Sequence, residues 1–196
     1  MVGRRVGVFG GTFDPPHVGH LVAAIEARDA LGLDVVLMVV ANRPWQKVGT
    51  RAISSAADRL AMVEAAVEGV DRIEASDLEI RRGGTTYTVD TLEELRRDDP
   101  EGERYVILGA DAAAGLGTWE RPADLAALCR IVVVDRPGSD VRVPPGFVVD
   151  RVDVPQLEIS STDLRDRAAS GRSLRFLVPD GVISVLRDRR LYGDRP

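Results

Sequence analysis

The chain has 196 residues, 44% hydrophobic and 29% charged, proportions typical of a globular domain that forms a core without disulfides or structural metals. Its single cysteine, Cys129, excludes a disulfide framework and favours a reducing compartment, and the net charge of −5 argues against a nucleic-acid-binding surface. No apolar run approaches the roughly 18 residues of a membrane span, and the first residues show no signal-peptide pattern. We therefore expect a cytoplasmic protein that binds neither nucleic acid nor membrane.

In the first half of the chain, strand-like and helical patterns alternate. The sequence predicts, in order, a strand at 5–9, a turn at 10–16, a helix at 17–31, a strand at 35–40, a polar loop at 42–50, a helix at 55–68, a strand at 72–75 that 78–81 extends, a turn at 82–84 and a helix at 88–97. The run at 35–40 is apolar and largely β-branched, which is typical of a strand buried on both faces. We expect Thr88 to cap the last of these helices.

The second half continues the alternation and ends in helices. It predicts, in order, a strand at 104–108, a turn at 109–111, a helix at 122–128, a strand at 130–134, an irregular connection at 136–155 with one strand at 147–149, and helices at 161–169 and 179–189. Apolar strands that alternate with amphipathic helices predict an α/β fold with a Rossmann-like, doubly wound parallel sheet. We expect one domain over 1–196, with a small C-terminal helical part at about 157–196.

The densest motif is Gly-Gly-Thr-Phe-Asp-Pro-Pro-His-Val-Gly-His at 10–20. Both histidines of the chain, His17 and His20, lie three residues apart in the first turn of a predicted helix, where they share one face. Backbone N–H groups at this helix end favour an anion, and Gly10 and Gly11 let a phosphate approach the main chain. The motif therefore predicts a phosphate-binding site rather than a zinc site, which needs about four ligands.

Other parts of the chain allow two interpretations. Ser160, Ser161 and Thr162 start a predicted helix with Arg165 one turn later, which indicates either a second phosphate contact or an ordinary capped helix. Lys47 is the only lysine beside 25 arginines, so it either needs a compact ammonium group or is a leftover surface residue. The sequence lacks a P-loop, a Gly-x-Gly-x-x-Gly fingerprint and a nucleophile elbow, and nothing in it suggests covalent catalysis.

Taken together, these residues resemble the HxGH nucleotidyltransferase superfamily. Its (G)GTFDPxHxGH and SSTx[IV]R signatures are similar to the motifs at 10–20 and 160–165. Within the superfamily, the chain resembles the bacterial nicotinate-mononucleotide adenylyltransferases, and further similarities span nearly the whole chain: Thr-Tyr-Thr-Val-Asp-Thr-Leu at 86–92, Gly-Ala-Asp at 109–111, Trp119, and Arg-Pro-Gly at 136–138.

The resemblance implies a sheet of the nucleotidyltransferase type and single-step adenylyl transfer from ATP to nicotinate mononucleotide. Mg²⁺ is implied to arrive with ATP, because the sequence offers no carboxylate cage and no metal ligands are expected in the chain. The implied catalytic contacts to phosphate come from His17, His20, Lys47 and Arg165. The implied ATP-binding residues are Gly10, Gly11, Thr12, Phe13, Asp111, Arg136, Ser160, Ser161 and Thr162. The implied mononucleotide-binding residues are Thr86, Tyr87, Thr88 and Trp119.

The chain departs from the family pattern in two places. Trp45 and Gln46 precede Lys47 where many members carry Pro-Pro-His-Lys, and Glu120 follows Trp119 where a ring-bearing residue is frequent. We expect Glu120 to point away from a nicotinate carboxylate. Three alternatives stay open: transfer to nicotinamide mononucleotide, transfer to phosphopantetheine, and a catalytically silent nucleotide-binding regulator. Whether the chain forms a homo-oligomer also stays open.

Overall fold

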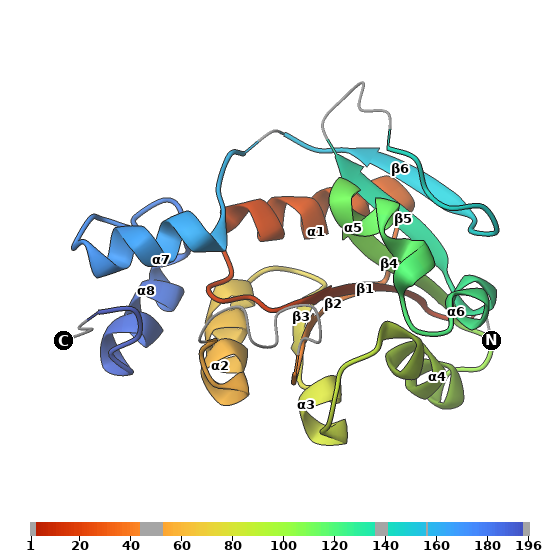
Figure 1. The fold of residues 1–196 in the computed structure, drawn as a ribbon, viewed down its shortest axis with the longest axis horizontal. Coiled ribbons are helices and arrows are strands. Elements are labelled where there is room, and N and C mark those ends of the chain that lie inside the picture. The colour runs from red at the N-terminus through yellow and green to blue at the C-terminus, as the bar shows by residue number, and fades with distance from the viewer. Residues whose placement is uncertain (1–2, 44–52, 136–140, 156, 194–196) are drawn as a thin grey trace.

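The computed structural model describes residues 3–43, 53–135, 141–155 and 157–193. It contains one six-stranded sheet with helices on both faces and a helical part at the C-terminal end (Figure 1). The strands are Arg5–Gly11 (β1), Val35–Val40 (β2), Ile73–Ser76 (β3), Glu103–Gly109 (β4), Arg130–Asp135 (β5) and Val149–Asp153 (β6). All neighbours pair in parallel, in the order β3-β2-β1-β4-β5-β6, which confirms the doubly wound parallel sheet.

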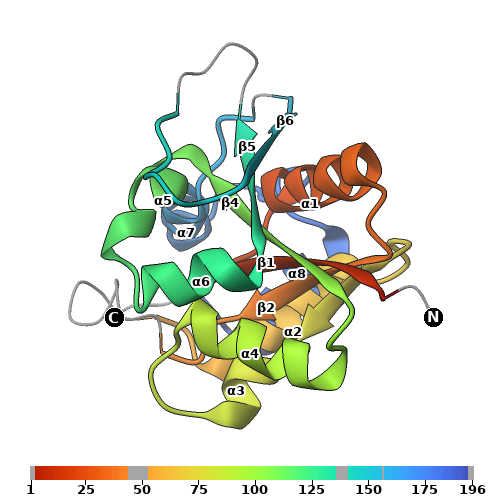
Figure 2. The same ribbon diagram turned by 90° about the vertical axis from the view of Figure 1, so that its right-hand side faces the viewer.

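The helices lie on both faces of the sheet. In chain order they are Val18–Leu31 (α1), Ala56–Val67 (α2), Leu78–Arg82 (α3), Thr88–Asp98 (α4), Ala110–Ala114 (α5), the 3₁₀ helix Leu116–Thr118 (η2), Pro122–Leu128 (α6), Ser161–Ala169 (α7) and Asp180–Asp188 (α8). Helix α1 lies on one side of the sheet, and α4 and α6 lie on the other (Figure 2). None of the helices within the described ranges is long and apolar enough to cross a membrane.

Four sequence predictions need correction. Residues 78–81 do not extend the sheet; they belong to α3, because only Ile80 is β-branched and Leu, Glu and Arg favour a helix. The strand expected at 147–149 is β6, which begins at Val149, and the turn at 109–111 runs into the alanine-rich helix α5. Thr88 is the first residue of helix α4 rather than its cap; Tyr87 precedes the helix and makes no capping hydrogen bond with its side chain.

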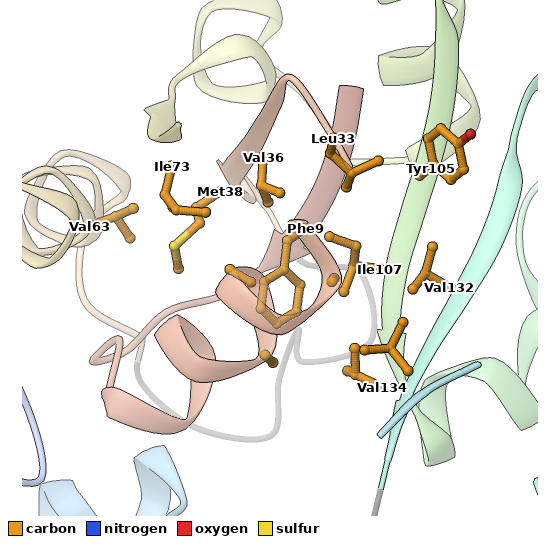
Figure 3. Close-up of a cluster of buried hydrophobic side chains, with 14 of the residues drawn as sticks. Phe9, Leu33, Val36, Met38, Val63, Ile73, Tyr105, Ile107, Val132 and Val134 are labelled. Carbon is orange, nitrogen blue, oxygen red and sulfur yellow. The ribbon is translucent and has the colours of Figure 1, made fainter. Parts of the chain in front are cut away.

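The core consists of three clusters. Small residues of α1, Ala23, Ala24 and Ala27, let that helix lie close to the sheet, where it covers side chains such as Phe9 and Ile107 (Figure 3). A second cluster lies between the opposite face and helices α4, α5 and α6. The third joins α7 and α8 to helix α2 at the edge of the sheet. The C-terminal helices are therefore held beside the carboxyl ends of β1 and β2.

Candidate active site

The carboxyl ends of the central strands border a cavity of about 250 Å³. This cavity is lined by seven of the residues predicted to bind ATP or mononucleotide: Gly10, Gly11, Thr12, Thr86, Tyr87, Thr88 and Trp119. The lining combines apolar and aromatic surface with a few polar groups, the usual character of a small-molecule site. Ligands of doubly wound sheets bind at this edge, outside the carboxyl ends of the strands.

The histidine pair lies at the start of α1. His17 is the residue before the first helical turn, and its backbone N–H donates to Nδ1 of His20 at 3.2 Å. The two rings are 3.7 Å apart between centroids, and the ring of Phe13 packs edge-on against His20 at 5.1 Å. A Cβ on Gly19 would lie 3.1 Å from Nδ1 of His17, so this glycine makes room for the imidazole of His17.

Burial sets the charge of His17. The residue is 7% exposed, and its Nδ1 is buried with no hydrogen-bond partner among the described residues. Loss of hydration lowers the pKa of His17 to about 4, so the imidazole is neutral near pH 7. The N-terminal end of a helix favours an anion, so His17 lies where a phosphate is expected.

The second predicted motif meets the first. Ser161 donates its Oγ hydrogen to the carbonyl of Pro15 at 2.9 Å, and Nη1 of Arg165 donates to the carbonyl of Asp14 at 2.7 Å. Nη2 of Arg165 also donates to the hydroxyl of Thr162 at 3.0 Å. Ser160 caps α7 by accepting from the N–H of Asp163. The α7 motif therefore caps its helix and also lies against the turn between β1 and α1.

Arg59 of helix α2 connects three segments of the site and was missed by the sequence analysis. Its side chain is 1% exposed and donates to the carbonyls of Ser54, Thr12 and Asn42 at 3.0, 3.0 and 3.1 Å. These carbonyls belong to the turn after β1, the loop after β2 and the segment before α2. A buried guanidinium needs such acceptors, and here they fix two of the segments that border the cavity.

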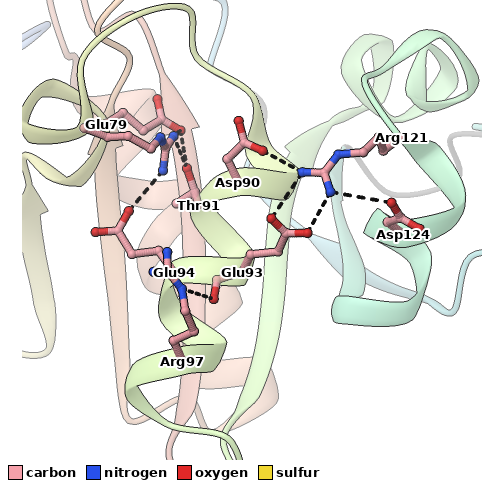
Figure 4. A network of polar contacts seen from close by, with 9 residues as sticks. Glu79, Asp90, Thr91, Glu93, Glu94, Arg97, Arg121 and Asp124 are labelled. Carbon is pink, nitrogen blue, oxygen red and sulfur yellow. Dashed lines mark hydrogen bonds and ion pairs between the residues drawn. The ribbon is translucent and has the colours of Figure 1, made fainter.

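The wall near Thr86 is held by a separate set of polar contacts. The backbone N–H of Asn42 donates to Oγ1 of Thr86 at 3.0 Å, and its side-chain amide donates to the carbonyl of Gly84 at 2.9 Å. The same wall contains Glu79, which is 4% exposed and accepts a hydrogen bond of 2.8 Å from Thr91 (Figure 4). Burial raises the pKa of Glu79. Glu79 also lines the cavity and was not predicted to do so.

The opposite wall is tied to helix α4 by Arg121. This residue donates to Oδ1 of Asp90 at 2.6 Å and to Oε1 of Glu93 at 2.7 Å (Figure 4). It follows directly after Trp119 and Glu120, so these ion pairs hold the tryptophan segment next to the start of α4. Glu120 was expected to point away from the pyridine pocket, but it contributes to the cavity lining beside Trp119.

The remaining predicted residues lie in different places. Asp111 is exposed in α5, directly after β4 and next to Ala112, which lines the cavity. Phe13 is buried with a left-handed backbone, φ 50°, and a Cβ on Gly11 would be 2.7 Å from its ring. Lys47 and Arg136 lie outside the described residues, as does Trp45.

A sequence signal for Arg59 did exist. Met62, Val63 and Ala66 follow it at i+3, i+4 and i+7, so a charged residue stands on the apolar face of α2. An arginine on such a face is rarely buried unless acceptor groups pair with its guanidinium. Asn42 and Glu79 carried no comparable pattern, because their partners lie on loops and on another helix.

In sequence and in fold, the chain is similar to nicotinate-nucleotide adenylyltransferases. The profile of the cytidylyltransferase-like family matches residues 8–167. A protein of Exiguobacterium sibiricum named probable nicotinate-nucleotide adenylyltransferase is 44% identical over 188 residues, which cover 96% of this chain and 98% of that relative. A protein of Streptomyces coelicolor with the same name is 46% identical over 186 residues, covering 93% and 98%. The nicotinic acid mononucleotide adenylyltransferase of Plasmodium falciparum, solved with NaAD, has the same fold, with a TM-score of 0.77 at 17% identity and coverage of 96% and 97%.

Proposed function

This chain belongs to the nicotinate-nucleotide adenylyltransferases of the cytidylyltransferase-like family, and we propose that it performs their reaction in the cavity described above. The enzyme transfers the adenylyl group of ATP to nicotinate mononucleotide, giving nicotinate adenine dinucleotide and pyrophosphate. An oxygen of the mononucleotide 5′-phosphate forms a bond to the α-phosphorus of ATP. The bond from that phosphorus to the oxygen bridging the β-phosphate breaks, and pyrophosphate leaves with the electron pair.

One observation carries this proposal: the glycine-rich turn at 10–20 and the aromatic side chains that line the cavity lie at the same carboxyl end of β1. The turn with His17 and His20 and the α7 motif with Arg165 lie on one side. Trp119 and Tyr87 line the cavity next to Gly10 and Gly11, on the other. Two substrates bound there would meet at the end of β1, where positioning and charge neutralisation promote an in-line transfer.

In this proposal the site residues divide by substrate. His17, His20, Lys47 and Arg165 contact the phosphates of ATP. Nucleotide contacts come from Gly10, Gly11, Thr12, Phe13, Asp111, Arg136, Ser160, Ser161 and Thr162. The pyridine mononucleotide is held by Thr86, Tyr87, Thr88 and Trp119, with the aromatic rings offering stacking surface. No residue is required as a nucleophile, because the attacking group belongs to the substrate.

Enzymes of this kind use a divalent cation, and we propose Mg²⁺ bound to ATP. Among the described residues, no three histidine, cysteine or carboxylate side chains come together as metal ligands. The groups that the turn presents are N–H and imidazole donors, which fit the phosphates of a metal–nucleotide complex rather than a bare cation. The cation would supply further neutralisation of phosphate charge.

An assay with alternative acceptors tests the proposal. The purified protein, ATP and MgCl₂ are incubated with nicotinate mononucleotide, nicotinamide mononucleotide or phosphopantetheine, and both pyrophosphate and the adenylylated product are measured. We expect the highest kcat/KM with nicotinate mononucleotide. Preference for either other acceptor would change the substrate, and no product with any acceptor would favour a nucleotide-binding regulator.

A single substitution ties the activity to the site. His20→Ala should lower kcat by about 10²–10³-fold, the usual loss when one transition-state donor is removed. The unfolding midpoint of the variant is measured in parallel. Full activity in a folded His20→Ala protein would place the chemistry elsewhere.

A further inference from the structure

The C-terminal end of the described chain reaches the turn between β1 and α1. Tyr192 donates its hydroxyl hydrogen to Oδ1 of Asp14 at 2.5 Å, across 178 residues of sequence. Asp14 is 1% exposed, and the hydroxyl of Tyr192 also lies 3.9 Å from Sδ of Met62 in α2. The tyrosine is therefore inserted between helix α2 and the turn that carries the nucleotide motif.

This contact is suited to holding a buried carboxylate. An acid group removed from water needs hydrogen bonds, and a phenol is a strong donor when it keeps its proton. Burial and the neighbouring Asp14 raise the pKa of Tyr192, so its hydroxyl remains a donor near pH 7. The carbonyl of Asp14 is held by Arg165, so groups from the C-terminal part bind both its main chain and its side chain.

Asp14 occupies a sensitive place in the turn. It follows Phe13, whose ring packs against His20, and it precedes the two prolines that lead to His17. Two further hydrogen bonds join this region to the C-terminal part. Ser161 donates to the carbonyl of Pro15, and the N–H of Val18 donates to the carbonyl of Leu177. The contact from Tyr192 acts on a side chain of the turn itself.

We propose that Tyr192 is a positioning residue for ATP: through Asp14, its hydroxyl holds the turn that presents His17 and the Gly10–Thr12 backbone to the phosphates. The inference rests on the proposed function, since it assigns ATP to this turn. A displacement of about 1 Å in a site of this kind can reduce the rate by about two orders of magnitude. The mononucleotide wall, by contrast, is held by hydrogen bonds of Asn42 and Arg121.

The test is Tyr192→Phe, which removes one oxygen and keeps the ring that packs against α2. The chain offers a matched control in Tyr105, whose hydroxyl contacts Arg5 and Glu103 at the amino ends of β1 and β4, away from the cavity. We expect Tyr192→Phe to lower kcat/KM for ATP by about tenfold, with KM for nicotinate mononucleotide within about twofold of wild type. Tyr105→Phe should leave both constants within about twofold of wild type.

A second measurement separates positioning from simple anchoring. Asp14→Ala and Tyr192→Phe are combined, and non-additive losses in kcat/KM for ATP are expected because the two groups act through one bond. Unchanged ATP kinetics in Tyr192→Phe, with or without a lower unfolding temperature, would overturn the proposal, as would equal losses for both substrates. Absence of product from the wild-type enzyme would refute the proposed function instead, so the two failures are distinguishable.

Discussion

At the scale of single residues, His17 combines burial with a position that attracts anions. Its imidazole has a pKa of about 4 because it is removed from water. It nevertheless lies at the N-terminus of α1, where N–H groups favour negative charge. A bound phosphate would supply the missing counter-charge and raise this pKa. The free enzyme therefore keeps a neutral imidazole that becomes easier to protonate once ATP is present.

The lowered pKa of His17 has a consequence for stability. Its folded value of about 4 lies below the ordinary value of 6.5, so the unfolded chain binds more protons between these two pH values. The stability contribution is complete above pH 6.5 and falls as the pH drops toward 4. Between pH 8 and pH 5 the loss should be about 2 kcal/mol.

Urea unfolding of wild type and His17→Gln at pH 8 and pH 5 measures this contribution. Other titrating groups affect both proteins alike, so the difference between them isolates His17. We expect wild type to lose about 2 kcal/mol more than the variant on going to pH 5. Equal losses would mean that the imidazole is already hydrated in the folded protein.

At the scale of elements, local sequence patterns predicted most of the fold. A short stretch of sequence is enough to show the apolar run of β2 and the helical periodicity of α1. Both elements lie where they were expected. The mistake at α3 arose because alternating Leu78 and Ile80 imitate a strand over only five residues. At that length, the buried side chains of a helix and of a strand produce the same pattern.

In the candidate site, too, contiguous motifs were predicted, whereas residues with distant partners were not. The turn at 10–20 and the motif at 160–165 are contiguous signatures, and they come together in the structure. Arg59 and Tyr192 were missed because their partners are carbonyl groups or a residue 178 positions away. The apolar face of α2 marks Arg59 as unusual, but no pattern in the chain identifies these partners, since they depend on how complete elements dock.

Arg121 provides a prediction about how elements shape the pocket. Its ion pairs with Asp90 and Glu93 fasten the Trp119 segment to α4, and its guanidinium holds the pKa of Glu93 below its usual value. Arg121→Gln should release this wall and raise KM for the mononucleotide by about fivefold, with KM for ATP within about twofold. Steady-state kinetics with each substrate varied in turn measures the difference.

Arg130→Gln is the matched control for that experiment. Arg130 binds Asp150 through two hydrogen bonds of 2.8 Å, but it begins β5, at the amino end of the strand, whereas the cavity lies at the carboxyl ends. It should leave both KM values unchanged. Similar effects of the two substitutions would show that loss of an ion pair, and not its place beside Trp119, changes KM.

At the scale of the whole molecule, the site depends on both ends of the chain. Strand β1 supplies the nucleotide turn, while α7 and the residues after α8 hold that turn from the other side (Figure 1). The C-terminal helices also share their apolar cluster with Met62 and Ala66 of α2. A cluster completed by α2 favours one cooperative unit over 1–196 rather than a separate C-terminal domain.

Leu186→Ala tests this cooperativity. Leu186 is 5% exposed in α8, so its truncation should lower the free energy of unfolding by about 2–4 kcal/mol. Both tryptophans precede residue 157, so their fluorescence reports on the part of the chain that does not contain the substitution. If the chain is one unit, the urea midpoints from tryptophan fluorescence and far-ultraviolet circular dichroism shift together. A fluorescence midpoint that stays at the wild-type value, while the dichroism signal gains an early phase, would show that the C-terminal helices unfold on their own.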